Sequence, residues 1–248
     1  MIDLPLPDGS AEAYLAVPPD LAAGETRPGV LFFMDAFGLR PQIEAMADRI
    51  ASWGYVVLAP NVFHRTGTVS DIAPTADLRV AEERERFFAT LRPHFAALTP
   101  DRSDADTVAY VAALRARPEV GDGPIGVTGY CMGARLATRA AGNHPDDVAA
   151  AAGFHGGRLA TEDPDSPHLL LAHARAELVY GHADGDPSMP PDAIARLGAA
   201  LAAAGLTATN EVYAGAQHGY TMADTSSYDE TAAERASAAL RELLARAL

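Results

Sequence analysis

The sequence has only one cysteine, Cys131, among its 248 residues. A single cysteine excludes a disulfide within the chain and any metal site built from several thiolates. Long apolar runs are also missing, since no stretch approaches the roughly 18 uninterrupted apolar residues of a membrane span. The first residues, Met1-Ile2-Asp3-Leu4-Pro5, lack the basic region and apolar core of a signal peptide. These absences predict a cytoplasmic protein.

Positive charge is scarce as well. The chain has 19 arginines and no lysine against 33 aspartates and glutamates, a net charge of −14. Such an excess of negative charge disfavours binding to nucleic acid or to an anionic membrane surface. It does not exclude an anionic small-molecule substrate, because a few local arginines can dominate at short range. The oligomeric state, monomer or dimer, is left open.

The order of elements predicts one α/β domain over residues 1–248. Residues 2–17 are typical of a β-hairpin. Continuous apolar runs at 29–34 and 55–60 predict strands buried on both faces, and further strands are expected at 124–130, 148–154, 176–181 and 208–213. Helical patterns lie between them at 41–53, 76–98, 101–117 (with Ser103 or Asp104 as N-cap), 190–204 and 229–248. Alternation of strands and helices indicates a mostly parallel central sheet with helices on both faces and the hairpin antiparallel at its N-terminal end.

The most informative motif surrounds the cysteine. Gly129 and Gly133 lie two residues either side of Cys131, so the pattern is G-x-C-x-G at a junction between an apolar run and a helical segment. This is the nucleophile-elbow pattern with cysteine in place of serine. A sharp strand-to-helix turn would expose the sulfur beside a helix N-terminus, where a thiolate and an oxyanion are both favoured.

Two further residues complete a catalytic order. Cys131, Asp184 and His218 follow three predicted strands, in the chain order nucleophile, acid, histidine of α/β-hydrolases. Cys131 would attack a carbonyl, His218 would move the proton, and Asp184 would orient the imidazole. Asp186 could equally be the acid, although Asp184 lies closer to the strand end. The residue after the nucleophile, Met132, is the first expected oxyanion donor. The second is expected after the 29–34 strand, at Ala36 or alternatively at Phe37.

Four segments together resemble the dienelactone hydrolase family of α/β-hydrolases. They are Met34-Asp35-Ala36-Phe37-Gly38, Gly129-Tyr130-Cys131-Met132-Gly133, Gly181-His182-Ala183-Asp184 and Gly215-Ala216-Gln217-His218-Gly219. The resemblance extends over nearly the whole chain. It implies the α/β-hydrolase fold and hydrolysis of small-molecule esters or lactones through a cysteinyl thioester, without metal or organic cofactor.

The resemblance also implies roles for other residues. The family carries an acid, usually glutamate, where this chain has Asp35, and that acid takes part in activating the cysteine. If Asp35 does not have this role, it is expected to be a solvated loop carboxylate or a helix cap. Family members bind a substrate carboxylate with arginines, for which Arg84 and Arg86 are candidates, although both also fit a solvated helical face. The family's second arginine, after the histidine, has no counterpart in His218-Gly219-Tyr220-Thr221-Met222-Ala223. A more apolar pocket is therefore expected, and the residues expected to bind substrate include Phe37, Tyr130 and Tyr220.

Three other interpretations remain open. Carboxylate and imidazole groups suit a metal, and such groups are close in sequence at His168, His173, His182, Asp184 and Asp186, but without tight ligand spacing. A thiol sensor or non-catalytic binding protein would use Cys131 alone, yet the chain has no resolving cysteine. A thioesterase or acyl-transferase would use the same residues as the hydrolase.

Overall fold

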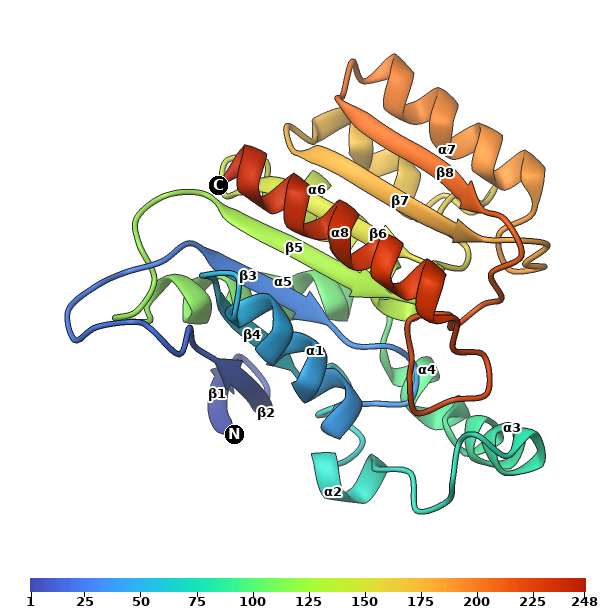
Figure 1. The fold of residues 1–248 in the computed structure, drawn as a ribbon, viewed down its shortest axis with the longest axis horizontal. Coiled ribbons are helices and arrows are strands. Elements are labelled where there is room, and N and C mark those ends of the chain that lie inside the picture. Colours follow the sequence, from blue (N-terminus) through green and yellow to red (C-terminus); the bar gives the residue numbers. More distant parts are fainter. The chain divides into compact units, whose positions relative to one another are not determined.

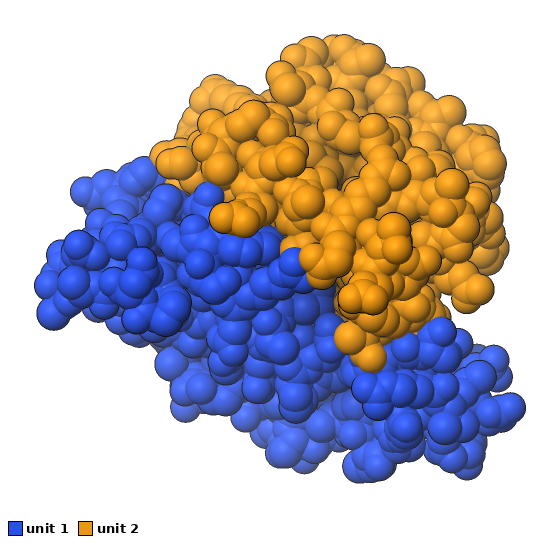
Figure 2. Space-filling model, in the orientation of Figure 1, with its two compact units in different colours: residues 1–123, 224–226 blue, residues 124–223, 227–248 orange.

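The computed structural model describes residues 1–248, and contacts within the chain divide it into two compact units (Figure 2). Unit 1 comprises residues 1–123 and 224–226, and unit 2 comprises residues 124–223 and 227–248. The strands are β1 (Ile2–Leu6), β2 (Gly9–Ala16), β3 (Gly29–Phe33), β4 (Val56–Pro60), β5 (Ile125–Tyr130), β6 (Val148–Phe154), β7 (Glu177–Ala183) and β8 (Ala208–Tyr213). The helices are α1 (Pro41–Ala51), α2 (Val69–Ile72), α3 (Ala81–Thr90), α4 (Arg92–Ala97), α5 (Pro100–Arg115), α6 (Met132–Asn143), the 3-10 helix η1 (Pro167–His173), α7 (Pro191–Ala203) and α8 (Glu230–Ala247).

Unit 1 contains the predicted hairpin and two buried strands. Its strand order is β1-β2-β4-β3, in which β2 is antiparallel to both β1 and β4, and β3 is parallel to β4. Every residue of β3 and β4 is buried, as their continuous apolar sequence predicts. In Figure 1, α1 lies in front of these strands and α5 behind them. The helices on both faces explain why neither strand alternates between polar and apolar residues.

Unit 2 consists of four parallel strands in the order β5-β6-β7-β8. Helices connect consecutive strands, as parallel pairing requires. In Figure 1, α8 crosses in front of these strands and α6 lies behind. The prediction of a mostly parallel sheet with an antiparallel N-terminal hairpin and helices on both faces is confirmed within each unit. The assignment of residues 1–248 to one domain stays a prediction.

The predicted 76–98 helix is wrong, because the segment forms α3 and α4 with a break at Leu91. Pro93 lies in the first turn of α4, where its missing N–H costs nothing, but inside a continuous helix its ring would clash with the preceding turn. The N-cap of α5 is Thr99, whose hydroxyl accepts the Arg102 N–H, rather than Ser103 or Asp104. Helices α2 and η1 were not predicted.

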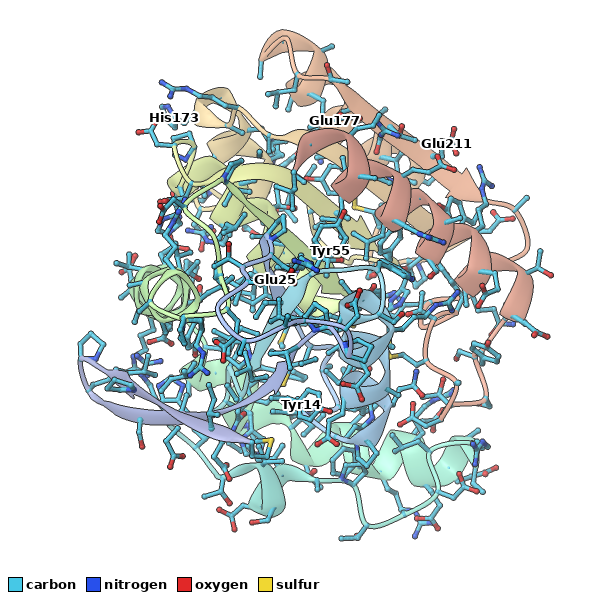
Figure 3. The ribbon with its side chains drawn as sticks, turned by 60° about the vertical axis from the view of Figure 1, so that its left-hand side comes forward. Tyr14, Glu25, Tyr55, His173, Glu177 and Glu211 are labelled. Atoms are coloured by element: carbon cyan, nitrogen blue, oxygen red, sulfur yellow. The ribbon has the colours of Figure 1, made fainter.

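Ion pairs join α8 to the two strands beside it. Glu177 on β7 accepts from the Arg246 guanidinium at 2.6 Å, and Glu211 on β8 pairs with Arg235. Figure 3 shows Glu177 and Glu211 close to this helix. Leu240 and Leu244 on the apolar face of α8 are buried. No helix in the structure combines the length and apolar character needed to cross a bilayer.

Candidate active site

The cysteine occupies a strained turn between β5 and α6. Cys131 has φ 53° and ψ −115°, a left-handed conformation that is unfavourable for a residue with a side chain. Its backbone N–H donates to the Phe154 carbonyl at 3.0 Å, which ties the turn to β6. A Cβ on Gly129 would lie 2.0 Å from the Gly133 carbonyl oxygen, so the helix can follow the strand this closely only because residue 129 is glycine. The turn therefore has the geometry that the G-x-C-x-G motif predicts.

His218 lies between the sulfur and a carboxylate. Its Nε2 is 3.0 Å from Cys131 Sγ, and its Nδ1 is 2.6 Å from Asp186 Oδ2. The Asp186 side chain is 3% exposed, and its second oxygen accepts the Ser188 N–H at 2.8 Å. Both imidazole nitrogens are thus engaged, one by the nucleophile and one by a buried acid. All three side chains belong to unit 2.

The predicted pairing of His218 with Asp184 is wrong, and the alternative residue Asp186 makes the contact. Asp184 is exposed, and its Oδ2 accepts the Gly215 N–H at 2.8 Å, which fastens the loop after β8. The chain then turns at Gly185, where φ is 64°, and this turn brings Asp186 back into the interior. The residue nearer the strand end therefore points outward, and the one after the glycine points inward.

Electrostatics favour a charged His218. Burial lowers the pKa of His218, but the adjacent Cys131 sulfur and the Asp186 carboxylate outweigh it and raise the pKa to about 10. Burial raises the pKa of Asp186, yet the hydrogen bond and charge of His218 outweigh it and lower the pKa to about 2. An imidazolium beside an ionised Asp186 is therefore the stable state at neutral pH.

The two predicted oxyanion donors occupy the expected elements. Met132 is the first residue of α6, so its backbone N–H is one of those left without a partner inside the helix. Ala36 belongs to unit 1, where it is buried in the loop between β3 and α1. Their joint action on an oxyanion stays a prediction.

Asp35 is neither solvated nor a helix cap. It is 2% exposed, and its two oxygens accept from Arg40 at 2.6 and 3.0 Å, while Oδ1 also accepts the Phe37 N–H. Arg40 is itself buried and also donates to Asp224 at 2.6 and 3.1 Å. Burial lowers the pKa of Arg40, but the two carboxylates outweigh it and raise the pKa above its usual value. The structure thus makes Asp35 part of a buried ion-pair cluster within unit 1, and its role toward the cysteine stays a prediction.

The other predicted substrate-binding residues of unit 1 lie in or near α3. Phe37 is half-buried, with its ring centroid 6.0 Å from that of Phe87 on this helix. Arg84 donates to the Ser226 hydroxyl, and the exposed Arg86 pairs with Glu83 one turn earlier. Both arginines already have protein partners. Binding of substrate by these three residues stays a prediction.

The two tyrosines predicted to bind substrate are core residues. Tyr220 is fully buried, and its hydroxyl donates to the Gly181 carbonyl at 2.9 Å. Tyr130 is 4% exposed, and its ring stacks on Phe154 with centroids 5.5 Å apart. Both rings therefore belong to the interior of unit 2, and contact of either ring with substrate stays a prediction.

The alternative metal-binding group does not assemble. His182 Nε2 is 2.6 Å from Asn210 Oδ1, His168 Nδ1 is 2.8 Å from the Ser166 hydroxyl, and Asp186 bonds to His218. His173, at the end of η1, is exposed. Side chains spaced closely enough for a metal are found elsewhere, at Asp8, His64 and Asp106, where the Arg65 guanidinium already bonds both carboxylates.

Sequence reasoning gave no role to one residue beside the site. His155 follows β6 and is fully buried, with its ring centroid 5.3 Å from that of His218. Its position after a strand was the only signal in the sequence, and it did not distinguish a site residue from a core histidine.

Comparisons with known proteins identify the family to which the chain belongs. The model of the dienelactone hydrolase family matches residues 11–248. A protein of Methylorubrum extorquens named "Putative carboxymethylenebutenolidase" is 29% identical over 226 residues, covering 88% of this chain and 71% of the relative. The carboxymethylenebutenolidase of Rhodococcus opacus is 29% identical over 192 residues, covering 77% of this chain and 68% of the relative. The crystal structure of P91, a dienelactone hydrolase-like promiscuous phosphotriesterase from metagenomic libraries, superposes with a TM-score of 0.81 at 20% identity over 99% of this chain and 96% of that one, which shows a shared fold.

Proposed function

The chain belongs to the dienelactone hydrolase family, and from this premise we propose that it hydrolyses small-molecule esters or lactones through a thioester on Cys131. His218 would act as general base and general acid, and Asp186 would orient it. The observation that carries the proposal is the continuous line of contacts from Cys131 Sγ to His218 at 3.0 Å and from His218 to Asp186 at 2.6 Å. A thiol sensor would need the sulfur but neither the imidazole nor the acid.

Each step follows from the protonation state of the site. With the proton held on His218 Nε2, 3.0 Å from the sulfur, Cys131 Sγ attacks the carbonyl carbon and a tetrahedral oxyanion forms. The N–H group of Met132, at the start of α6, is the proposed donor to this oxyanion from unit 2. Collapse breaks the bond to the alkoxide oxygen, which takes the proton from His218 and leaves a thioester on Cys131.

Deacylation uses the same groups in the reverse sense. His218, now neutral, removes a proton from water as the water oxygen attacks the thioester carbonyl. The thiolate leaves, the acid product departs, and His218 holds the proton again as imidazolium. Asp186 remains ionised throughout, since its role is to fix the ring and stabilise its charge. These steps require no metal or organic cofactor.

The test is intact-mass spectrometry after brief incubation with p-nitrophenyl acetate, with chromophore release followed in parallel. We expect an acyl adduct that maps to Cys131 and is absent from Cys131→Ala. In His218→Ala the adduct should form slowly and persist, because water then lacks its base. Alkylation of the wild type by iodoacetamide is the control for an accessible thiol. Turnover that survives Cys131→Ala would overturn the proposal.

A further inference from the structure

The histidine after β6 is built into the interior of unit 2. His155 is 0% exposed, and its backbone N–H donates to the Gly181 carbonyl on β7 at 2.8 Å. The same carbonyl accepts the Tyr220 hydroxyl at 2.9 Å. The φ of His155 is 38°, a conformation that residues other than glycine rarely adopt. The Gly181 carbonyl of β7 therefore fixes both the backbone of His155 and the hydroxyl of Tyr220.

The imidazole of His155 contacts three residues of the loop that carries His218. Its ring meets the His218 ring edge-on, with centroids 5.3 Å apart and planes inclined at 68°. It meets the Tyr220 ring in the same manner at 5.0 Å and 78°. Its Nε2 is 2.7 Å from the Thr221 hydroxyl oxygen. The buried His155 side chain thus contacts the loop at the proposed base His218 and also at Tyr220 and Thr221.

The loop needs such an anchor because its backbone is inherently adaptable. Gly215 and Gly219 both have positive φ, 79° and 93°, on either side of His218. A histidine hydrogen-bonded at both nitrogens keeps those bonds only while its ring plane is held within roughly 10–20° of the productive orientation. The hydrogen bonds at its two nitrogens are not the only contacts of His218. Its ring is also restrained by the edge-on contact with the His155 ring.

We propose that His155 is a positioning residue that holds the His218 ring in line between Cys131 and Asp186 through its edge-on contact and its hydrogen bond to Thr221. The inference rests on the proposed function of His218 and deepens it. His155 does not touch the sulfur or a reacting atom in this arrangement; it acts through His218 and the loop.

Charge and hydrogen bonding distinguish this histidine from a simple packing residue. Burial, and then the charge of His218, lower the pKa of His155 well below its usual value, so its ring stays neutral while His218 carries the proton. Its Nδ1 is buried without a hydrogen-bond partner, which destabilises the fold relative to an apolar ring of the same size. Phenylalanine would avoid that penalty but would lose the bond to Thr221. A purely structural role thus predicts that His155→Phe is harmless, and a positioning role predicts the opposite.

The test compares His155→Phe with Thr221→Val, which removes the same hydrogen bond from its other end. The matched control is His168→Phe, since His168 is also buried and bonded to a hydroxyl, that of Ser166 at 2.8 Å, but lies in η1. The readouts are kcat and KM with p-nitrophenyl acetate, the rate of Cys131 alkylation by iodoacetamide at pH 7, and the urea midpoint of unfolding.

We expect His155→Phe and Thr221→Val each to lower kcat and the alkylation rate about tenfold, because misplacement of a catalytic group by about 1 Å can slow a reaction up to roughly a hundredfold. KM should stay within about twofold, since substrate binding is untouched. The double variant should be no slower than either single one, because both remove one interaction. The urea midpoint of His155→Phe should equal or exceed that of the wild type.

Either of two outcomes would overturn the proposal. In the first, His155→Phe and Thr221→Val have the same kcat and alkylation rate as His168→Phe. In the second, the loss of kcat in each variant is proportional to the fall in its urea midpoint. If His155→Phe does not fold, Thr221→Val decides alone. Alkylation of Cys131 needs no ester turnover, so the two proposals can fail separately. If the wild type forms no acyl adduct but the two variants are alkylated slowly, positioning by His155 is supported and the hydrolase function is refuted. If the wild type forms the acyl adduct but both variants are alkylated at the wild-type rate, only positioning by His155 is refuted.

Discussion

Replacement of Asp186 by asparagine should slow the enzyme far more than the same replacement of Asp184. In Asp186→Asn the new side chain would keep the size of the old one but lack the charge 2.6 Å from His218 Nδ1. Its amide group could also face the ring with a donor, which would favour the wrong tautomer for base catalysis. Asp184→Asn, in contrast, keeps a carbonyl oxygen that can accept the Gly215 N–H as the carboxylate does.

The size of the effect follows from the burial of the contact. A hydrogen bond to a charged group contributes about 1.5–3 kcal/mol, and this one joins a carboxylate with 3% of its side chain exposed. If that stabilisation is needed in the transition state, kcat should fall roughly 10- to 150-fold in Asp186→Asn. In Asp184→Asn it should stay within about twofold, since the exposed carboxylate mainly holds the backbone of a loop.

The assay is steady-state hydrolysis of p-nitrophenyl acetate from pH 5 to 10, with urea unfolding of each variant as the control for stability. In Asp186→Asn the high-pH limb of kcat/KM should also move to lower pH, because Asp186 helps to raise the pKa of His218 to about 10. Equal losses in the two variants, or a larger loss in Asp184→Asn, would refute the assignment of the acid and restore the sequence-based one.

Three further predictions concern stability. Gly129→Ala, whose methyl would collide with α6, should lower the unfolding free energy by about 3 kcal/mol in urea titrations, whereas Gly123→Ala, which meets no atom within 4 Å, should change it little. Arg40→Leu should lower it by about 3–5 kcal/mol by leaving the buried Asp35 without its cation, and the double variant with Asp35→Leu should recover much of the loss. The stabilisation that comes from the raised pKa of His218 is complete below pH 6.5 and is lost as the pH rises to about 10, so the urea midpoint should fall over that range. An equal fall in His218→Gln would contradict the assignment of this effect to His218.

The strands and the elbow could be predicted because their signals are local. Five consecutive apolar residues from Gly29 to Phe33 specify a strand buried on both faces, and the structure has it. Gly129 specifies a turn too tight for a Cβ, and the 2.0 Å approach of such a Cβ to the Gly133 carbonyl oxygen confirms it. The prediction of one helix over 76–98 was wrong although a local signal opposed it, since Pro93 lies inside that segment and proline inside a helix is unfavourable.

The acid could not be chosen from sequence because the choice depends on one turn. Two aspartates lie two residues apart around Gly185, and only the backbone angles of that glycine decide which carboxylate points inward. The pairing of Arg40 with Asp224 and the partner of His155 were out of reach for a different reason. Arg40 is paired with a carboxylate 184 residues later, and His155 with a hydroxyl 66 residues later. Such pairings belong to the folded chain and leave no spacing signal.

The ion-pair cluster around Arg40 has a consequence for synthesis of the chain. Residues 224–226 belong to unit 1 although the chain before and after them belongs to unit 2. Asp224 leaves the ribosome long after Asp35 and Arg40, since chains emerge from the N-terminus at about 5–20 residues per second. Until it arrives, the nascent unit 1 holds a guanidinium with one carboxylate fewer than in the finished protein. Completion of the N-terminal unit is therefore a late event, and it is tied to the part of the chain that directly follows the His218 loop.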